Sequence, residues 1–223
     1  HIHNIRTTSI LEQPGIEATF AQCYRALAER PEVRLVACSD AVAHDFRDWC
    51  DLPPEQEIST VYAGYQFPDR KNCGIRMRAD RRRAFGLPPD CLIVGGAMRL
   101  AWVKRPLLWV EAAHLIAQKF PSVHFVIFGD GELAGETRAK IAEVGLTDRF
   151  TLVGWVEEIV SAMSCLDVFM HSSVSEGFAN VLVAAQAGGV PDVAYHVGGC
   201  PVSLVPSLTG SIVDCAHTDP LAA

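Results

Sequence analysis

Short apolar runs rich in β-branched and aromatic residues recur along the chain, and glycine, proline or polar residues bound each of them. Such runs are typical of strands, and they lie at 33–39, 91–98, 123–129, 149–154 and 166–172. Between them, apolar residues recur at three- and four-residue intervals, which predicts helices over 106–120, 134–145 and 156–165. Strands that alternate with helices at this spacing predict a parallel sheet covered on both faces. From about Cys91 onward we therefore expect a doubly wound α/β domain.

The first ninety residues are patterned differently. The strand at 33–39 precedes a predicted helix over 40–50, for which Asp40 is the expected cap, and a predicted strand and turn over 58–68. Residues 69–83 then hold seven of the chain's 19 lysines and arginines. Two interpretations stay open for this basic run: a solvated linker and helix face, or a patch facing anionic lipid or a charged substrate.

Composition narrows the classes of protein to consider. The 223 residues are 49% hydrophobic and carry a formal net charge of −7, which favours a globular protein and gives no indication of a nucleic-acid partner. No apolar run reaches the roughly 18 residues that span a bilayer, and the first residues lack a signal-peptide pattern. We therefore predict a cytoplasmic protein. The eight cysteines form no C-x-x-C pair, so the sequence predicts no zinc or dithiol site.

The stretch 172-SSVSEGFANVLVAAQAGGVP-191 places its only acidic residue, Glu176, just before an Ala-rich helix pattern that starts around Ala179. Backbone N–H groups at a helix start have no intrahelical acceptor, so they form an anion site at the carboxyl edge of the sheet. Glu176 would repel a phosphate there, but a carboxylate beside a phosphate site can accept hydrogen bonds from sugar hydroxyls. The alternative is that Glu176 only stabilises the helix start through the helix dipole.

A second candidate anion site follows the first strand of the α/β domain, at 95-GGAMRLAWVKRP-106. We expect Gly95 and Gly96 to let a ligand approach the backbone closely in the turn. Arg99, Lys104 and Arg105 bring enough positive charge for two phosphates. Neither G-x-G-x-x-G nor a Walker G-K-[ST] motif occurs, so this site does not match a nicotinamide or P-loop protein.

These motifs occur in a specific order: GGAMRL with Lys104, 128-FGDGEL-133, 153-VGWV-156, the stretch from 167 to 191, and 197-VGG-199. Together they resemble the donor-binding half of the retaining GT-B glycosyltransferases of family 4, most densely over residues 93–200. The resemblance implies a Rossmann-like doubly wound domain at 91–223, a linker and basic helix at 67–90, and part of an acceptor domain at 1–66.

The resemblance also implies roles for particular residues. Arg99 and Lys104 would hold the diphosphate of a nucleotide-sugar donor, and Glu176 would contact the transferred sugar. The backbone of Gly177, Phe178 and Ala179 would complete the phosphate cradle, with Asn180 and Val181 near the nucleotide. No metal or other cofactor is then expected, since the cations and the helix start neutralise the departing diphosphate.

Three features depart from the family pattern. A second acid is usual eight residues after the first, to bind the ribose, and Ala184 stands there. Asp192 replaces an apolar strand residue, which predicts a distorted strand or a compensating polar contact. The acceptor domain and the terminal helices are incomplete, so we expect a truncated chain that is inactive alone.

Two functions therefore remain open from the sequence. The first is a glycosyltransferase that acts on a glycan or lipid-linked acceptor, with the basic run as a peripheral contact at the inner membrane face. The second is a nucleotide-sugar-binding protein without turnover, which Ala184 and the truncation favour. Phosphorylase or hexose-phosphate synthase chemistry is a third alternative on the same fold.

Overall fold

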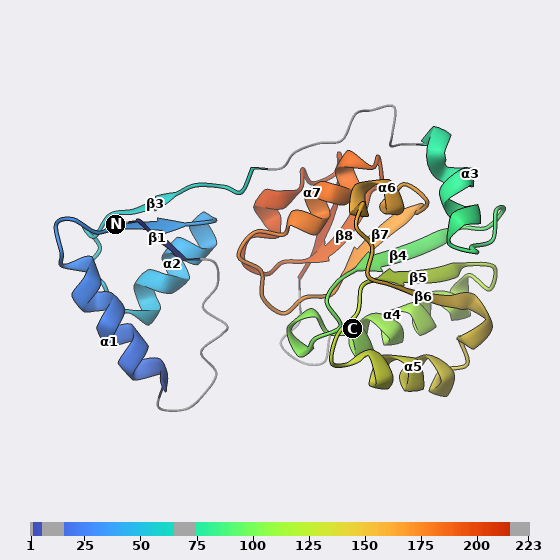
Figure 1. The fold of residues 1–223 in the computed structure, drawn as a ribbon, viewed down its shortest axis with the longest axis horizontal. Helices are drawn as coiled ribbons and strands as arrows, with labels where there is room; N and C mark the ends of the chain where they lie inside the picture. Colours follow the sequence, from blue (N-terminus) through green and yellow to red (C-terminus); the bar gives the residue numbers. More distant parts are fainter. Residues whose placement is uncertain (1, 6–15, 65–74, 215–223) are drawn as a thin grey trace. The chain divides into compact units, whose positions relative to one another are not determined.

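The computed structural model describes residues 2–5, 16–64 and 75–214 of the chain (Figure 1). Its internal contacts divide the protein into two compact units. Unit 1 comprises His1–Gly64 with two later loops, Ser175–Ala179 and Val197–Ser203. Unit 2 comprises Tyr65–Val174, Asn180–His196 and Leu204–Ala223. Each unit has a parallel sheet of its own.

Unit 1 contains a three-stranded parallel sheet in the order β1-β2-β3, with two helices. The elements are β1 (Ile2–Ile5), α1 (Ile16–Ala28), β2 (Arg34–Ala37), α2 (Asp40–Trp49) and β3 (Ile58–Thr60). Tyr24 of α1 packs edge-on against Phe46 and Trp49 of α2, with ring centroids 5.0 and 6.0 Å apart. Leu35 and Ala37 of β2 are buried in the same core. The predicted strand at 33–39 is confirmed. Of the strand and turn predicted over 58–68, the strand is β3, and residues 65–68 lie outside the described residues.

The start of α2 corrects the predicted cap. The side chain of Ser39, whose backbone is extended, accepts a hydrogen bond from the N–H of Val42 at 3.3 Å. Ser39 is therefore the N-cap, and Asp40 is the first residue of the helix. The Asp40 carboxylate instead accepts a hydrogen bond from the hydroxyl of Tyr62 at 3.0 Å.

Unit 2 contains a six-stranded parallel sheet in the order β6-β5-β4-β7-β8-β9. Its strands are β4 (Ile93–Ala97), β5 (His124–Phe128), β6 (Phe150–Gly154), β7 (Val168–His171), β8 (Asp192–Tyr195) and β9 (Gly210–Val213). The four strands predicted between 91 and 172 are confirmed. β9 was not predicted, because 210-GSIV-213 is too short and too polar to resemble the buried runs.

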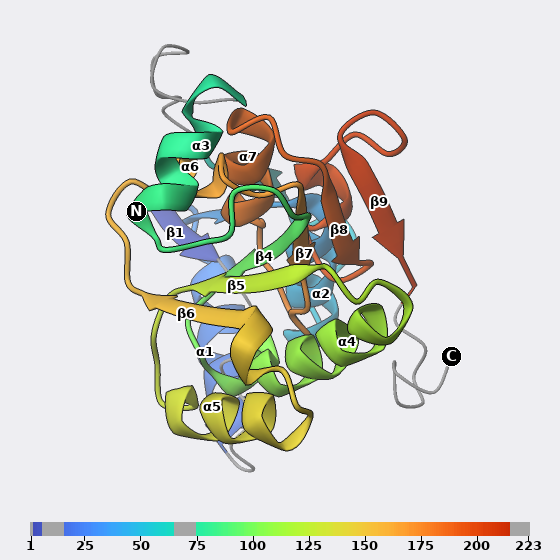
Figure 2. The same cartoon turned by 90° about the vertical axis from the view of Figure 1, so that its right-hand side faces the viewer.

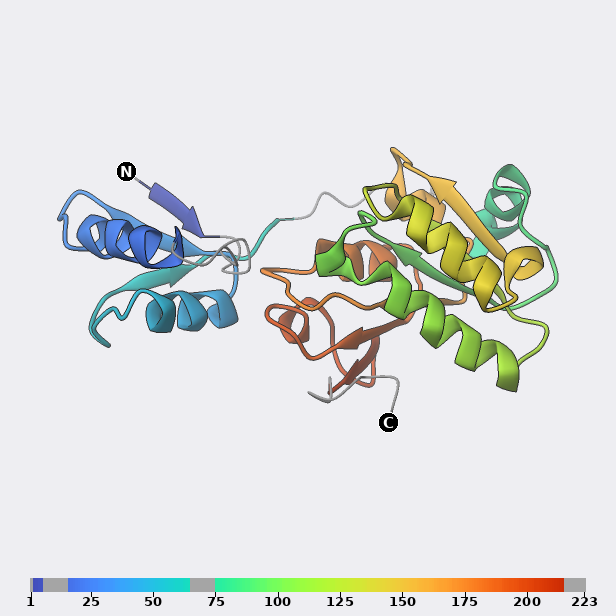
Figure 3. The ribbon, with the colours of Figure 1, turned by 90° about the horizontal axis from the view of Figure 1, so that it is seen from below.

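Helices cover both faces of this sheet, as predicted. The helices are α3 (Ile75–Ala84), α4 (Pro106–Lys119), α5 (Ala134–Glu143), α6 (Ile159–Met163) and α7 (Asn180–Ala187). α4 and α5 lie side by side on one face, and α3, α6 and α7 cover the other (Figures 2 and 3). Trp109 of α4 is fully buried against Phe125 of β5 and Phe150 of β6. This apolar layer fixes the strand ends from which the site loops emerge.

The prediction of a distorted strand at Asp192 is wrong. β8 pairs regularly with β7 on one side and β9 on the other, and Asp192 lies opposite Phe169 and Gly210. Its side chain is 1% exposed, so Asp192 is also not available for a polar contact with a ligand. Burial raises the pKa of this carboxyl to about 8, against a smaller lowering effect of the neighbouring Gln186 side chain of α7. Asp192 is therefore a protonated core residue at neutral pH.

The basic run contributes to the fold of unit 2 at the amino edge of its sheet. Arg78 and Arg82 of α3 bind the two carboxylate oxygens of Asp167, just before β7, at 2.5 and 2.7 Å. The Arg82 side chain is 6% exposed and also donates to three backbone carbonyls, those of Cys165, Pro89 and Cys91. These two arginines are thus neither a solvated face nor a lipid-binding patch. Residues 69–74 of the run lie outside the described residues.

In the described parts of the chain, every helix is too short or too polar to cross a bilayer.

Candidate functional site

The strand order reverses between β4 and β7 of unit 2. β5 and β6 continue the sheet on one side of β4, and β8 and β9 continue it on the other side of β7. The loops that follow β4 and β7 therefore leave the sheet in different directions, and ligands bind at such a switch point outside the carboxyl ends of the strands. The candidate anion sites at 95–106 and 172–191 belong to these two loops.

A cavity of about 710 Å³ lies at this carboxyl edge. Its lining comes from the ends of three strands and from two helices, namely Ala97, Met98, Arg99, Phe128, Gly129, Asp130, Gly131, Trp155, Val156, Ile159 and Val181. The volume falls within the range of small-molecule sites. Of the residues predicted for the site, Arg99 and Val181 lie in this lining.

The loops after β4 and β5 are fastened to each other beside the cavity. The N–H groups of Met98 and Leu100 donate to the carbonyls of Phe128 and Asp130 at 2.9 and 3.0 Å, and Leu133 donates back to Leu100 at 2.9 Å. A Cβ at Gly129 would overlap the carbonyl oxygen of Met98, and φ there is 127°. Glycine in the FGDG segment therefore permits the close approach of two backbones. Arg99 stands on this fixed backbone.

The prediction that Gly95 and Gly96 lie in a turn where a ligand approaches the backbone is wrong. Both residues lie inside β4 and are buried, rather than in the turn that follows it. A Cβ at Gly95 would meet the side chain of Leu166, and one at Gly96 would meet the Trp109 indole at 2.9 Å. These glycines make room for core side chains, and the cavity lining begins only at Ala97.

Lys104 ends a short 3₁₀ turn, Trp102–Lys104, in the loop between β4 and α4. The loop is fastened to the end of β7, because the Ser172 hydroxyl donates to the carbonyl of Lys104 at 2.7 Å and Val174 N–H donates to that of Val103 at 3.0 Å. Arg105 follows with a left-handed backbone, φ 50°, before α4 begins. Lys104 is half-buried and lies outside the lining of the cavity.

Glu176, Gly177, Phe178 and Ala179 belong to unit 1, where they pack on the loop that contains Gly198 and Gly199. Gly199 N–H donates to the carbonyl of Glu176 at 2.8 Å, and a Cβ at Gly198 would overlap the same oxygen. The backbone of Glu176 is therefore held closely, and its side chain is half-buried.

The predicted phosphate cradle loses one donor. Ala179 is buried, and its N–H donates to the hydroxyl of Ser203 at 3.0 Å. That hydroxyl in turn donates to the carbonyl of Gly199 at 2.8 Å. Because Ser203 occupies the Ala179 N–H, this group is not available to a phosphate, and the prediction for Ala179 is wrong on this point.

α7 begins at Asn180, one residue after the predicted start. Asn180 is exposed, and Val181 lines the cavity. Ala184, at the position where the sequence predicted a missing ribose contact, is 2% exposed and lies outside the cavity lining. The helix is accordingly intact without the second acid.

Charged side chains of both signs line the cavity or pair with a residue that lines it. Arg99 is paired with Glu132, whose carboxylate lies 3.1 Å from the guanidinium. A backbone hydrogen bond within Glu132 lowers the pKa of its carboxyl, and Arg99 lowers it further. Asp130 lines the cavity, and its carboxylate accepts the N–H of Gly131 at 2.8 Å. Among the residues that the structure describes, no three His, Cys, Asp or Glu side chains come together as a metal site would require.

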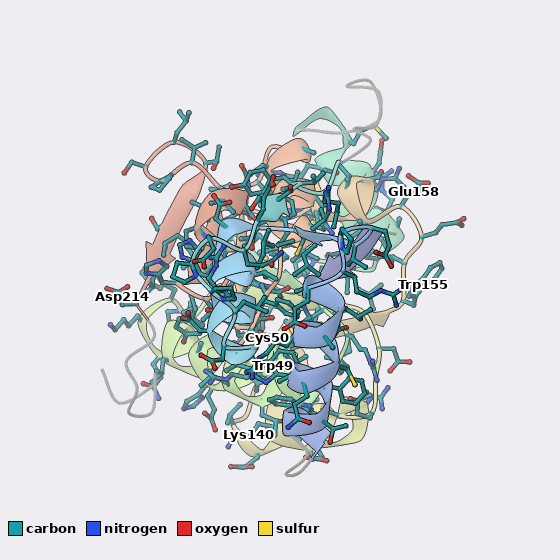
Figure 4. The ribbon with its side chains drawn as sticks, turned by 90° about the vertical axis from the view of Figure 1, so that its left-hand side faces the viewer. Trp49, Cys50, Lys140, Trp155, Glu158 and Asp214 are labelled. Carbon is teal, nitrogen blue, oxygen red and sulfur yellow. The ribbon has the colours of Figure 1, made fainter. Side chains whose placement is uncertain are left out.

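Sequence reasoning missed Trp155 and Asp130 as cavity residues. Trp155 follows β6 and projects from its loop (Figure 4), with 76% of its surface exposed. An indole so placed beside a cavity offers a flat face for an aromatic ligand. Both residues occur in motifs that the sequence singled out, VGWV and FGDGEL, directly after a predicted strand. That position at the carboxyl edge was the available signal.

Comparison with known proteins gives a family match. The profile of the family described as glycosyl transferases, group 1, matches residues 88–223. This range includes the whole six-stranded sheet and every residue that lines the cavity.

Two curated relatives and one solved structure illustrate the similarity. The Vi polysaccharide biosynthesis protein VipC/TviE of Salmonella typhi is 28% identical over 196 residues, which is 87% of this chain and 34% of the relative. The D-inositol 3-phosphate glycosyltransferase of Mycolicibacterium smegmatis is 36% identical over 140 residues, 60% of this chain and 31% of the relative. The chain thus spans about a third of the length of these relatives.

The structure of Anabaena Alr3699/HepE in complex with UDP-glucose superposes with a TM-score of 0.80 at 23% identity, over 99% of this chain and 60% of that one. The predicted fold class, a parallel α/β sheet of the GT-B type, is confirmed.

Proposed function

Because this chain belongs to the group 1 glycosyltransferases, we propose that it binds a nucleotide-diphosphate-sugar donor and serves transfer of the sugar to a glycan or lipid-linked acceptor. The observation that carries this proposal is the cavity at the carboxyl edge of β4, β5 and β6, which Arg99 and Trp155 line. The names of the relatives support it: one is a polysaccharide biosynthesis protein, and one solved neighbour binds UDP-glucose.

The nucleoside is the part of the donor that suits the cavity. Apolar groups of Met98, Phe128 and Ile159 line it, and Trp155 adds an exposed indole on which a base can stack. The backbone polar groups of these loops can fix the orientation of the base. The cavity therefore supports a nucleotide as the ligand, without selecting among the bases.

The diphosphate is the part that Arg99 would bind, together with Lys104. A guanidinium forms paired hydrogen bonds to phosphate oxygens, and its charge offsets the charge that develops on the leaving group as the glycosyl bond breaks. Stabilisation of this kind acts on the transition state more than on the bound donor. We propose on this basis that transfer needs no metal and proceeds with retention, as the family 4 resemblance implies, with Glu176 accepting hydrogen bonds from the transferred sugar.

Binding without turnover is the second candidate, and two observations favour it. Ala184 offers no carboxylate to the ribose, and the Ala179 N–H is already bonded to Ser203. In this alternative the chain retains the nucleotide cavity but stabilises the leaving diphosphate too weakly for catalysis. Such a chain would bind the donor and leave it intact.

Calorimetric titration of the full chain with UDP, GDP and their hexose conjugates tests both candidates. We expect binding of one nucleotide series, weakened tenfold or more by Arg99→Ala, since a hydrogen bond to a charged group contributes roughly 1.5–3 kcal/mol. Arg83→Ala is the matched control, because Arg83 is an exposed arginine on α3, at the opposite edge of the sheet. Nucleotide affinity that Arg99→Ala leaves unchanged, or no nucleotide binding by a folded sample, would refute the proposed site.

Glu176→Ala separates the sugar from the nucleotide. We expect it to weaken the hexose conjugate more than the free diphosphate, because a sugar-facing carboxylate has no partner in UDP or GDP. Equal losses for both ligands would instead assign Glu176 to the helix start. Hydrolysis or transfer of the bound donor, followed by chromatography of the products, then distinguishes turnover from binding alone.

A further inference from the structure

Arg99 has an anionic side-chain partner, Glu132. Its guanidinium Nη2 lies 3.1 Å from Oε2 of Glu132, and the two residues are 33 positions apart in sequence. Arg99 is the residue proposed above to bind the donor diphosphate. A diphosphate that enters this site therefore meets a guanidinium engaged by a carboxylate.

The backbones that carry the pair are fixed rather than mobile relative to each other. Leu100 N–H donates to the carbonyl of Asp130, and Leu133 N–H donates to that of Leu100, so each partner is flanked by a bonded neighbour. Gly131 lies so close to Leu100 that a Cβ there would press on its backbone at 2.5 Å. Only the side chains of Arg99 and Glu132 must turn for the pair to open.

Both side chains have room to turn. Arg99 is 73% and Glu132 48% exposed, so their pairing is weak and reversible. Their effect on an anion is nevertheless opposite in sign. Asp130 lines the cavity as Arg99 does, and Glu132 is paired with Arg99, so two carboxylates lie close to the guanidinium and oppose the binding of a diphosphate.

We propose that Glu132 is an exchangeable counter-ion of Arg99, which occupies the guanidinium in the empty site, yields it to the diphosphate of the donor and recaptures it as the nucleoside diphosphate departs. The inference rests on the proposed function, because it assigns Glu132 a part in the same site. Such a carboxylate lowers the affinity for the product and speeds its release, so Glu132 is a positioning residue that acts through Arg99.

Glu132→Gln tests this role, since it keeps the shape of the side chain and removes its charge. We expect roughly a two- to five-fold gain in affinity for UDP and for inorganic pyrophosphate, in line with the modest strength of an exposed ion pair. The gain should reside mainly in a slower dissociation rate, measured by stopped-flow displacement, and uridine binding should stay unchanged. Glu136→Gln, an exposed carboxylate in the first turn of α5, is the control with the same change of charge.

A double-mutant cycle ties the effect to Arg99. In the Arg99→Ala background, Glu132→Gln should no longer change the affinity for pyrophosphate. Unchanged or weaker pyrophosphate binding by Glu132→Gln in the otherwise intact protein would overturn the inference, because it would mean that Glu132 holds Arg99 in its binding position or does nothing. An equal gain from Glu136→Gln would also overturn it, as a general charge effect.

Pyrophosphate keeps this inference distinguishable from the proposed function. If the protein binds pyrophosphate but no nucleotide, the nucleotide-sugar proposal fails, and the ratio of the two pyrophosphate affinities still decides the role of Glu132. If UDP or GDP binds but neither the unaltered protein nor Glu132→Gln binds pyrophosphate, the inference about Glu132 fails and the nucleotide-sugar proposal stands.

Discussion

Two arginine–carboxylate pairs lie at opposite edges of the six-stranded sheet. At the amino edge, Arg82 and Asp167 are mostly buried, 2.7 Å apart, and Arg82 also binds three carbonyls. At the carboxyl edge, Arg99 and Glu132 are exposed and 3.1 Å apart. The same two chemical groups thus hold the fold at one edge and remain available for exchange at the other, and burial makes the difference.

The largest effect on the free energy of unfolding is expected from replacing Arg82, the buried arginine of the amino-edge pair. Arg82→Ala leaves the buried carboxylate of Asp167 with one arginine fewer and three carbonyls without their donor, so we expect a loss of about 3–5 kcal/mol in the free energy of unfolding. Urea denaturation of the full chain measures it. Arg83→Ala, on the same helix but 81% exposed at its side chain, should change the free energy of unfolding by less than about 0.5 kcal/mol.

If Arg82→Ala does not fold, Asp167→Asn provides the weaker perturbation. It keeps a hydrogen-bonding side chain opposite both arginines, and a measurable loss of stability is still expected. An effect of either variant no larger than that of Arg83→Ala would contradict a structural role for the amino-edge pair.

Asp192 extends the comparison of the two pairs, because it is a buried aspartate that forms no ion pair with an arginine in the described structure. Its pKa is raised by burial from the ordinary 3.8 to about 8, so the folded state keeps a proton that the unfolded chain releases. This contribution to stability is full below about pH 4, falls as the pH rises toward 8, and changes no further above it. Between pH 6 and pH 8 we expect a loss of about 2 kcal/mol, at roughly 1.4 kcal/mol per pH unit.

Asp192→Asn should remove that slope. Urea denaturation at pH 6 and pH 8 compares it with the unaltered chain and with Asp90→Asn, an exposed control. A slope that persists in Asp192→Asn would mean that another group releases the proton.

The smallest effect on stability is expected at the carboxyl edge. Glu132→Gln should leave the free energy of unfolding unchanged within the error of the measurement, because an exposed ion pair contributes little. The same denaturation experiment measures it. A loss that approaches that of Arg82→Ala would show the two pairs to be equivalent and would remove the basis of the comparison.

The sequence predicted what depends on local pattern. β4, β5, β6 and β7 are contiguous apolar runs, and α4 has both the apolar spacing and Pro106 at its start. β9 was not predicted, because pairing with β8 decides that so short a segment is a strand. The cap of α2 was assigned to Asp40 rather than Ser39, because side-chain orientation decides between the two neighbouring residues. Gly95 was misplaced because a glycine next to a turn has the same sequence signature as one that packs against Leu166.

The sequence indicated individual residues of the candidate site but not the contacts between residues that are distant in sequence. Arg99 and Val181 line the cavity, whereas the bond from Ala179 to Ser203 depends on a residue 24 positions away. The pair between Arg99 and Glu132 is likewise a tertiary contact. The roles of Arg99, Lys104, Glu176 and Val181 in donor binding stay predictions.

The clamp of Arg78 and Arg82 on Asp167 also bears on how the second unit should be cut for expression. A boundary placed by family similarity, at residue 88, would remove α3. The Asp167 carboxylate at the amino edge of the sheet would then lose both of its arginine partners. A recombinant domain that starts before Ile75 keeps the whole helix, and the choice between these two starting points should decide whether the product is soluble or forms inclusion bodies.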